Sequence, residues 1–146
     1  MSHDRETHHS DIRRARTVDE LVAAGPLFDS PTRPDAAREF LEAPGHHLFL
    51  AYADGEEPVG FISGVETIHP DKGREMFLYE LEVAEPYRRR GIGRALIGEL
   101  VGVARERGCY DVWVGVDVDN VVALSTYRAA GGVEDGACTV ITWPLG

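Results

Sequence analysis

The sequence predicts one α/β domain, of the α+β type, in which a mixed and mostly antiparallel sheet is flanked by helices. The chain has 146 residues and is 43% hydrophobic, which suits a single compact core. Three strand-like segments follow one another in the middle of the chain, and helices and strands alternate after them. We therefore expect residues 1–146 to form one domain whose first half is antiparallel.

The N-terminal part predicts a weak strand and two short helices. Residues 1–10 are polar and are expected to be a mobile tail, and residues 11–16 fit a weak edge strand. Apolar residues at helical spacing follow at Val18–Phe28 and at Asp35–Leu41. The proline-containing run 29–34 separates these two helices.

Three strands are expected next. His47–Ala53 and Val59–Thr67 are apolar, and the Asp-Gly pair between them is typical of a hairpin, so they should pair antiparallel. The third strand, Met76–Ala84, alternates and predicts one apolar face and one mostly acidic face. The first face is assigned Phe77, Tyr79, Leu81 and Val83, and the second is assigned Leu78, Glu80 and Glu82.

The last part of the chain alternates helix and strand. A long amphipathic helix is expected over Gly91–Arg107, and Gly108 supplies its C-terminal stop. A strand over Asp111–Asp117, a helix over Val121–Ala130 and a final strand over Cys138–Trp143 complete the predicted order.

Composition argues against several classes of protein. With 25 acidic and 15 basic residues the net charge is -10, which disfavours nucleic-acid binding and suits cationic partners, although it also serves solubility alone. No segment reaches the roughly 20 apolar residues of a membrane helix, and the start lacks a signal-peptide pattern, so a cytoplasmic protein is expected. Cys109 and Cys138 match no disulfide framework or zinc motif, and no metal is expected.

A basic, glycine-containing turn leads directly into the long helix. It runs from Arg88 to Arg94 and reads Arg-Arg-Arg-Gly-Ile-Gly-Arg. Unpaired N–H groups at a helix N-terminus, glycines that let a phosphate approach and nearby arginines together favour a pyrophosphate. A Rossmann motif fits less well, because Leu96 stands where its third small residue belongs. A Walker A loop is excluded because no Gly-Lys-Ser/Thr occurs.

Two ordered motifs resemble those of the GNAT acetyltransferases. The pattern Arg-x-x-Gly-x-Gly occurs at residues 88–93, and Asn-x-x-Ala-x-x-x-Tyr occurs at residues 120–127. The resemblance implies a GNAT-like fold. It also implies acetyl-coenzyme A (acetyl-CoA) as the co-substrate, bound where the third strand and the next one splay apart.

The same resemblance implies roles for individual residues. The pantetheine would bond to the backbone of Leu81 and Val83, and the Leu81 N–H would polarise the thioester carbonyl. Asn120 would contact the pantetheine, and Tyr127 would protonate the departing thiolate. A helix cap and a core aromatic are the plainer explanations of these two residues taken singly. The pyrophosphate would be held by Arg88, Arg89, Arg90, Gly91, Ile92, Gly93 and Arg94.

Within the family, residues 75–83 and the last helix and strand resemble the aminoglycoside 3-N-acetyltransferases. The resemblance implies that Glu80, where those enzymes usually have Asp, removes a proton from the acceptor amine. Glu82 is the fallback base, and an exposed acidic strand face is the plainer explanation of both. Asp117 and Asp119 are candidates for binding further ammonium groups, and strand-end chemistry explains them equally well.

The predicted function is therefore direct acetyl transfer to an amine of a small polycation resembling an aminoglycoside. Acetylation of a polyamine, a small metabolite or a protein amine is the alternative within the same chemistry. A non-catalytic acyl-CoA sensor is the alternative from another class, and it would not need Glu80 and Tyr127. The resemblance also allows a homodimer.

Overall fold

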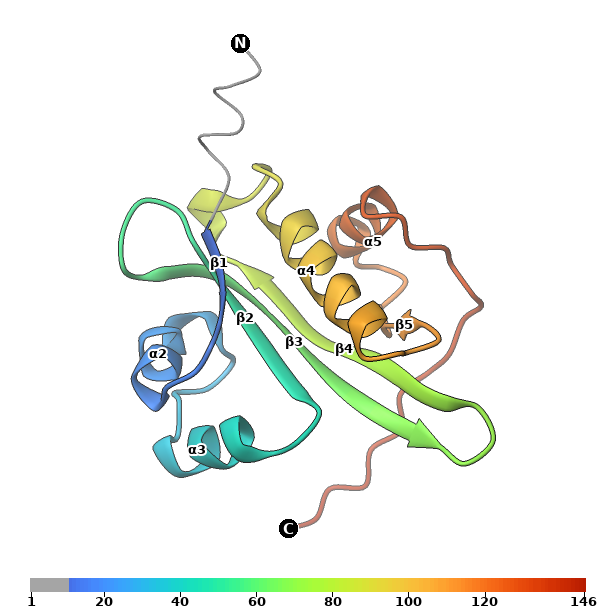
Figure 1. Ribbon diagram of the computed structural model, residues 1–146. Helices are drawn as coiled ribbons and strands as arrows, with labels where there is room; N and C mark the ends of the chain where they lie inside the picture. Colours follow the sequence, from blue (N-terminus) through green and yellow to red (C-terminus); the bar gives the residue numbers. More distant parts are fainter. Residues whose placement is uncertain (1–10) are drawn as a thin grey trace.

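The computed structural model describes residues 11–146 and contains a five-stranded sheet in the order β1-β2-β3-β4-β5 (Figure 1). All neighbouring strands are antiparallel except β4 and β5, which are parallel. This confirms the predicted mixed, mostly antiparallel sheet, while the predicted tail at 1–10 lies outside the described residues. In chain order the elements are β1 (Asp11–Arg14), α2 (Val18–Ala23), the 3-10 helix η1 (Gly25–Leu27), α3 (Pro34–Glu42), β2 (His46–Tyr52), β3 (Pro58–His69), β4 (Gly73–Val83), the 3-10 helix η2 (Glu85–Tyr87), α4 (Ile92–Glu106), β5 (Val112–Trp113) and α5 (Val121–Ala129).

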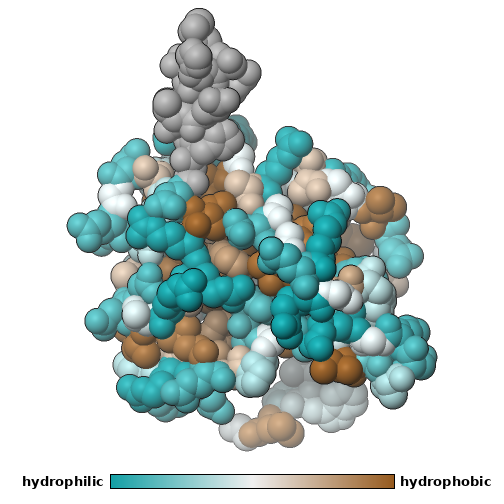
Figure 2. Space-filling view, viewed as in Figure 1, coloured by the Kyte–Doolittle hydropathy of each residue, from teal (hydrophilic) through white to brown (hydrophobic). Residues whose placement is uncertain are grey.

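Each face of the sheet has its own apolar core. Helix α4 packs its buried stripe against β2, β3 and β4, and α5 lies beside α4. On the other face, α2 and α3 pack with β2 and β3, where the rings of Phe28 and Phe61 meet edge to face at 4.8 Å. Figure 1 shows these two pairs of helices on opposite sides of the strands. Polar side chains cover most of the surface in Figure 2, as the high content of charged residues predicts.

A β-bulge in β4 changes which side chains share a face. Ser63 pairs with Glu80, but the next residue of β3, Gly64, pairs with Leu78, so Tyr79 is an extra residue on β4. The alternation of side chains between the two faces of the sheet therefore shifts by one residue at the bulge. The α4 core receives Met76, Leu78, Leu81 and Val83 from β4.

The predicted assignment of β4 side chains was therefore wrong at three positions. Leu78 lies in the α4 core, and Phe77, which alternates with it, lies on the opposite face together with Tyr79, whose exposed ring packs on that of Phe77. Glu80 and Glu82 do share a face, because Glu82 pairs with Phe61 of the α2–α3 core and Glu80 with Ser63. Strict alternation in the sequence cannot reveal a bulge, which depends on how β3 is paired.

Three predicted elements differ in extent. The helix expected over Val18–Phe28 ends at Ala23 and continues as a 3-10 turn, because Pro26 cannot donate to a helical hydrogen bond. The strand expected over Asp111–Asp117 is only Val112–Trp113. Cys138–Trp143 form no strand, because β5 ends too early to offer them a partner.

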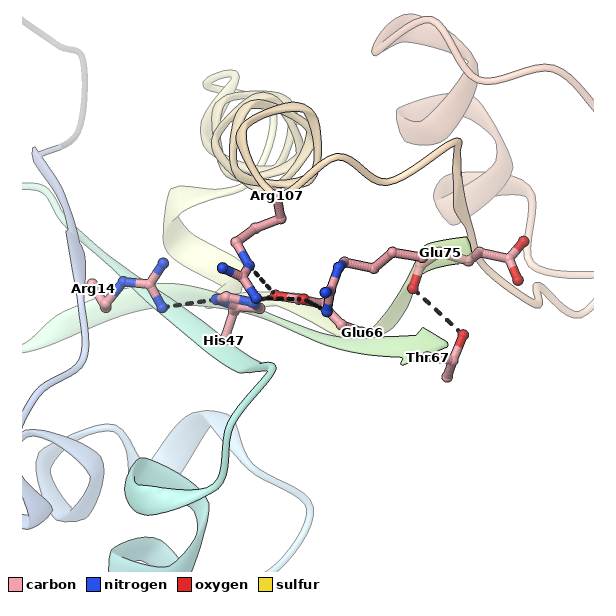
Figure 3. A network of polar contacts seen from close by, with 7 residues as sticks. Arg14, His47, Glu66, Thr67, Glu75 and Arg107 are labelled. Carbon is pink, nitrogen blue, oxygen red and sulfur yellow. Dashed lines mark hydrogen bonds and ion pairs between the residues drawn. The ribbon is translucent and has the colours of Figure 1, made fainter. Parts of the chain in front are cut away.

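A buried carboxylate joins four strands to the end of α4 (Figure 3). The Glu66 side chain is 2% exposed and accepts hydrogen bonds from His47 Nε2 (2.5 Å), Arg74 (2.8 Å) and Arg107 (3.0 and 3.2 Å). Arg14 donates to His47 Nδ1 at 2.9 Å, so the proton of a neutral ring is on Nε2. Desolvation opposes ionisation of Glu66, but the bonds from Arg107 and His47 hold its pKa at about 2. Burial lowers the pKa of His47, which keeps its ring neutral.

Candidate functional site

Strands β4 and β5 part after a very short pairing. Met76 and Phe77 pair with Val112 and Trp113, and β5 ends there. Residues 78–83 of β4 therefore have β3 on one side and no strand formed by residues 11–146 on the other. This leaves a free backbone edge along the half of β4 that carries the predicted cofactor contacts.

The free edge exposes the backbone of Leu81 and Val83. Ala84 N–H donates to Val59 on β3 at 2.8 Å, and backbone groups of successive strand residues point to alternate sides. The N–H and C=O groups of Leu81 and Val83 therefore point away from β3, into the gap. The Val83 carbonyl already accepts a hydrogen bond from Arg88 Nε at 2.8 Å.

The predicted phosphate loop forms an uncapped helix N-terminus. Gly91 is the residue before α4 and has φ of 83°, a conformation that glycine adopts without strain. No side chain in the described part of the protein caps this end, and the first helical bond runs from Ala95 N–H to the Gly91 carbonyl. The N–H groups of residues 92–94 thus have no acceptor within the described chain, which makes them suitable donors to an anion.

Gly93 faces the gap between β4 and the last helix. A β-carbon placed there would lie 3.4 Å from Thr126 Cγ2, 3.8 Å from Val83 Cγ2 and 4.0 Å from Leu81 Cδ2. The phosphate loop, β4 and α5 therefore meet around Gly93, which is where the cofactor was expected from the sequence.

Asn120 and Tyr127 lie on α5, at the far side of this gap. Asn120 is the N-cap residue, and its Oδ1 accepts from Ala123 N–H at 3.1 Å, so its amide nitrogen remains as a donor. Tyr127 packs partly buried against the α4 core, and this burial raises the pKa of its hydroxyl. The phenol therefore holds its proton at neutral pH.

Glu80 lies on the opposite face of β4, half-buried. Burial, followed by the nearby charge of Asp29, raises the pKa of Glu80 above its ordinary value. Asp29 comes from the loop between η1 and α3, and sequence reasoning treated it only as part of a helix-breaking run. A carboxylate whose pKa is raised towards neutrality is a better proton acceptor than an ordinary surface glutamate.

Further along this face lies a cavity of about 670 Å³. Glu82 and Arg88 line it, and their side chains approach to 3.7 Å. Its other acidic residues are Asp54, Glu56, Glu57 and Glu85. Sequence reasoning missed the acidic hairpin residues because it used them only as a turn signal. Five carboxylates and one arginine give the cavity a strongly negative lining that suits a cation.

Asp117 and Asp119 do not line this cavity. Both are exposed, and Asp119 N–H donates to Asp117 Oδ1 at 3.3 Å. Asn120 N–H donates to the Asp117 carbonyl at 2.9 Å, which sets up the start of α5. The hydrogen bonds of both residues lie in the turn before α5, which agrees with the alternative explanation given for them above.

The family model for the acetyltransferase (GNAT) family matches residues 14–131. The chain belongs to the GNAT acetyltransferase family. Among sequence relatives, the uncharacterized N-acetyltransferase YycN of Bacillus subtilis is 30% identical over 129 residues, covering 88% of this chain and 81% of YycN. The N-alpha-acetyltransferase RimI of Mycobacterium tuberculosis is 32% identical over 117 residues, covering 80% and 71%. The chain spans about half the length of rat N-acetyltransferase 8B (46%), with 27% identity over 70% of this chain.

Solved structures of acetyltransferases confirm the fold. An aminoglycoside acetyltransferase, meta-AAC0020 from a soil metagenomic sample, solved with sisomicin, has a TM-score of 0.86 at 19% identity and covers 94% and 97% of the two chains. Aminoglycoside N-acetyltransferase AAC(6')-Iy in complex with CoA has a TM-score of 0.76 at 22% identity, covering 94% and 95%. The aminoglycoside 6'-N-acetyltransferase AAC(6')-Ih from Acinetobacter baumannii has 0.77 at 17%, covering 94% and 99%.

Two further observations concern the described part of this GNAT chain. Residues 11–146 contain no group of three or more His, Cys, Asp or Glu side chains arranged to hold a metal ion. None of the helices in that range has the length and apolar character needed to cross a membrane.

Proposed function

We propose that this GNAT chain transfers the acetyl group of acetyl-CoA directly to an amine of a small polycationic acceptor of the aminoglycoside type. The observation that carries the proposal is the position of Glu80. It is half-buried, its pKa is raised, and it lies on the strand whose next residues offer a free backbone edge. A proton acceptor and a cofactor edge on the same short stretch of β4 are what amine acylation requires.

On this proposal, the cofactor lies along the free edge of β4. Backbone groups of Leu81 and Val83 bond to the pantetheine, and the Leu81 N–H polarises the acyl carbonyl. The amides at the start of α4, with Arg88, Arg89, Arg90 and Arg94, hold the pyrophosphate. Asn120 adds its free amide nitrogen as a donor. When bound, acetyl-CoA supplies the acetyl group as an activated thioester.

The residues on the two sides of β4 divide the proton transfers between them. Glu80 accepts the proton of the acceptor ammonium, and the free amine then forms a bond to the acyl carbon. As the carbon–sulfur bond breaks, Tyr127 gives its hydroxyl proton to the departing sulfur, and the second proton lost by the acylated nitrogen restores the Tyr127 hydroxyl. Neither Cys109 nor Cys138 forms a covalent intermediate in this scheme.

The acidic cavity supports a polycationic acceptor. Its carboxylates, with Glu82 among them, lie on the Glu80 face, so they can bind the ammonium groups that do not react. The sequence resemblance favours the 3-N amine as the reacting group. The 6'-N position is the other candidate, because solved proteins of the same fold carry that name. Mapping the acetylated nitrogen of the product by NMR decides between them.

A peptide N-terminus is the second candidate acceptor. It is favoured by the 32% identity to a protein named as an N-alpha-acetyltransferase. A peptide N-terminus brings a single amine to the site and makes less use of five carboxylates in one cavity. A non-catalytic acyl-CoA sensor is the third possibility, and it predicts cofactor binding with no turnover on any amine.

Thiol release from acetyl-CoA in the presence of an amine panel tests the proposal. We expect kcat/KM to be higher for aminoglycosides than for a monoamine with no other charged group or for a peptide with a free N-terminus. Glu80→Gln keeps the size of the side chain but removes its basicity, so kcat should fall by roughly a hundredfold. Glu99→Gln, on an exposed position of α4, is the matched control and should leave kcat unchanged. Full activity of Glu80→Gln would show that Glu80 is not the base. A preference for the peptide would contradict an acceptor of the aminoglycoside type.

A further inference from the structure

Three aromatic side chains form an exposed shelf where β4 meets β5. We define the aromatic shelf as Phe77, Tyr79 and Trp113. The Phe77 ring lies 4.5 Å from that of Trp113 and 5.7 Å from that of Tyr79, measured between ring centroids. Phe77 is partly covered, but Tyr79 is 62% exposed and Trp113 is 47% exposed. Two large rings with this exposure, packed on a third, mark a contact surface.

The shelf lies on the same face as Glu80. Phe77 alternates with Met76 and Leu78, both buried in the α4 core, so its ring is on the other side of the sheet. Trp113 pairs with Phe77 and shares that side. The apolar core beneath α2 and α3 takes no described residue from β4 or β5. The helices that cover this face therefore stop short of the shelf and leave it open.

The shelf also continues directly into the polar part of the site. Tyr79 is next to Glu80 in the chain, and Phe77 lies three residues away, roughly 10 Å along a strand. Opposite Glu80, Ser63 is 4% exposed, and its hydroxyl is the buried side-chain polar atom without a hydrogen-bond partner among the described residues. An apolar platform thus borders a carboxylate and a buried hydroxyl within about the length of one or two sugar rings.

We propose that the aromatic shelf is a specificity subsite that binds a ring of the acceptor, so that ring-bearing polyamines are selected over linear ones. This inference rests on the proposed function. An amino-substituted sugar or cyclitol ring presents an apolar face that covers the indole and phenol rings, while its ammonium groups are attracted to the faces of those rings. A linear polyamine of equal charge has no ring face to lay on the shelf and would lose more rotational freedom if it were held there, so it gains no net binding from these rings.

Kanamycin A and spermine, which carry equal numbers of amino groups, form the test pair. For Trp113→Ala we expect the KM for kanamycin A to rise roughly tenfold with kcat almost unchanged, and the KM for spermine to stay constant. Trp113→Phe should restore most of the loss, and Tyr79→Ala should repeat it more weakly. Trp143→Ala removes an exposed tryptophan far along the C-terminal segment and is the matched control.

Calorimetric titration of both amines into wild type and Trp113→Ala, followed without turnover, separates the two proposals. If wild type acetylates neither amine but binds kanamycin A in a Trp113-dependent way, the proposed function fails and the subsite stands. If Trp113→Ala weakens both amines equally, or neither, the subsite is overturned whatever the activity. A change of oligomeric mass in Trp113→Ala, with unchanged discrimination, would instead make the shelf a contact between protein chains.

Discussion

The two ends of helix α4 are built in opposite ways. At its C-terminal end, Arg107 joins the Glu66 carboxylate in a network of hydrogen bonds that spans four strands. At its N-terminal end, Gly91 provides no cap and the first amides have no acceptor in the described chain. One end is satisfied by the protein itself, and the other keeps its donors available. The comparison indicates that stability is concentrated at the end of the helix that takes no part in the proposed chemistry.

The electrostatics of the two ends follow the same division. A buried carboxylate surrounded by two arginines and a neutral histidine has its charge fully compensated, so it can remain ionised away from water. The opposite end combines the positive end of the helix dipole with Arg89, Arg90 and Arg94, and of these arginines and their neighbour Arg88 only Arg88 has an acidic partner among the described residues, Glu82. An anion that binds there stabilises the folded protein, because it binds the folded state and not the unfolded chain.

The largest expected effect comes from removing the Glu66 carboxylate at the C-terminal end of α4. Glu66→Ala should lower the free energy of unfolding by about 3 kcal/mol, because it leaves His47 and the arginines without their shared partner. The loss is kept from being larger by the arginine side chains, which are 33% and 50% exposed and can reach water. Urea denaturation at neutral pH measures the difference.

Asp11→Ala is the control for that experiment, because it removes a surface partner of Arg13 whose side chain is 58% exposed. It should change the free energy of unfolding by about 0.5 kcal/mol or less. The pH dependence gives a second check. The pKa of Glu66 is lower in the folded protein than its ordinary value of 4.5, so its contribution is complete above that pH and is lost as the pH falls towards about 2. A constant difference between wild type and Glu66→Gln down to pH 2 would contradict the network.

The second-largest expected effect tests the N-terminal end of α4. Gly93→Asp places a carboxylate beside the uncapped amides and directs it into the gap towards Thr126. The Kd for CoA should rise roughly tenfold or more, because the added negative charge repels phosphate and occupies part of its space. Gly98→Asp makes the same change on the same helix at an exposed position with open space, and it should leave the Kd unaltered. Equal affinity in the two variants would remove the loop from the cofactor site.

The smallest expected effect concerns α5, beside the N-terminal end of α4. Tyr127→Phe should lower kcat by roughly tenfold while changing the Kd for acetyl-CoA little, because a proton donor to the leaving sulfur acts mainly in the transition state. Tyr110→Phe alters an exposed tyrosine and serves as the comparison. If the two variants turn over at the same rate under conditions where chemistry limits kcat, Tyr127 is a core aromatic only.

Local signals explain what the sequence predicted well. Periodicity and glycine punctuation located the long helix and the loop before it, because both depend on residues close in the chain. The Glu66 network escaped detection, since His47 and Glu66 are 19 residues apart and meet only through the β2–β3 pairing. The acidic cavity was missed for a related reason. Its lining comes from segments that are ordinary turns until the fold brings them together.

The single extra residue at Tyr79 has a mechanical consequence. A bulge increases the local twist of its strand and bends it. Strand β4 follows β5 only up to Phe77, two residues before the bulge, and it continues without β5 beyond. The bend at the bulge thus directs the second half of β4 away from its parallel neighbour β5. Deleting Tyr79 would straighten the strand, so the width of the gap proposed for the cofactor depends on one inserted residue.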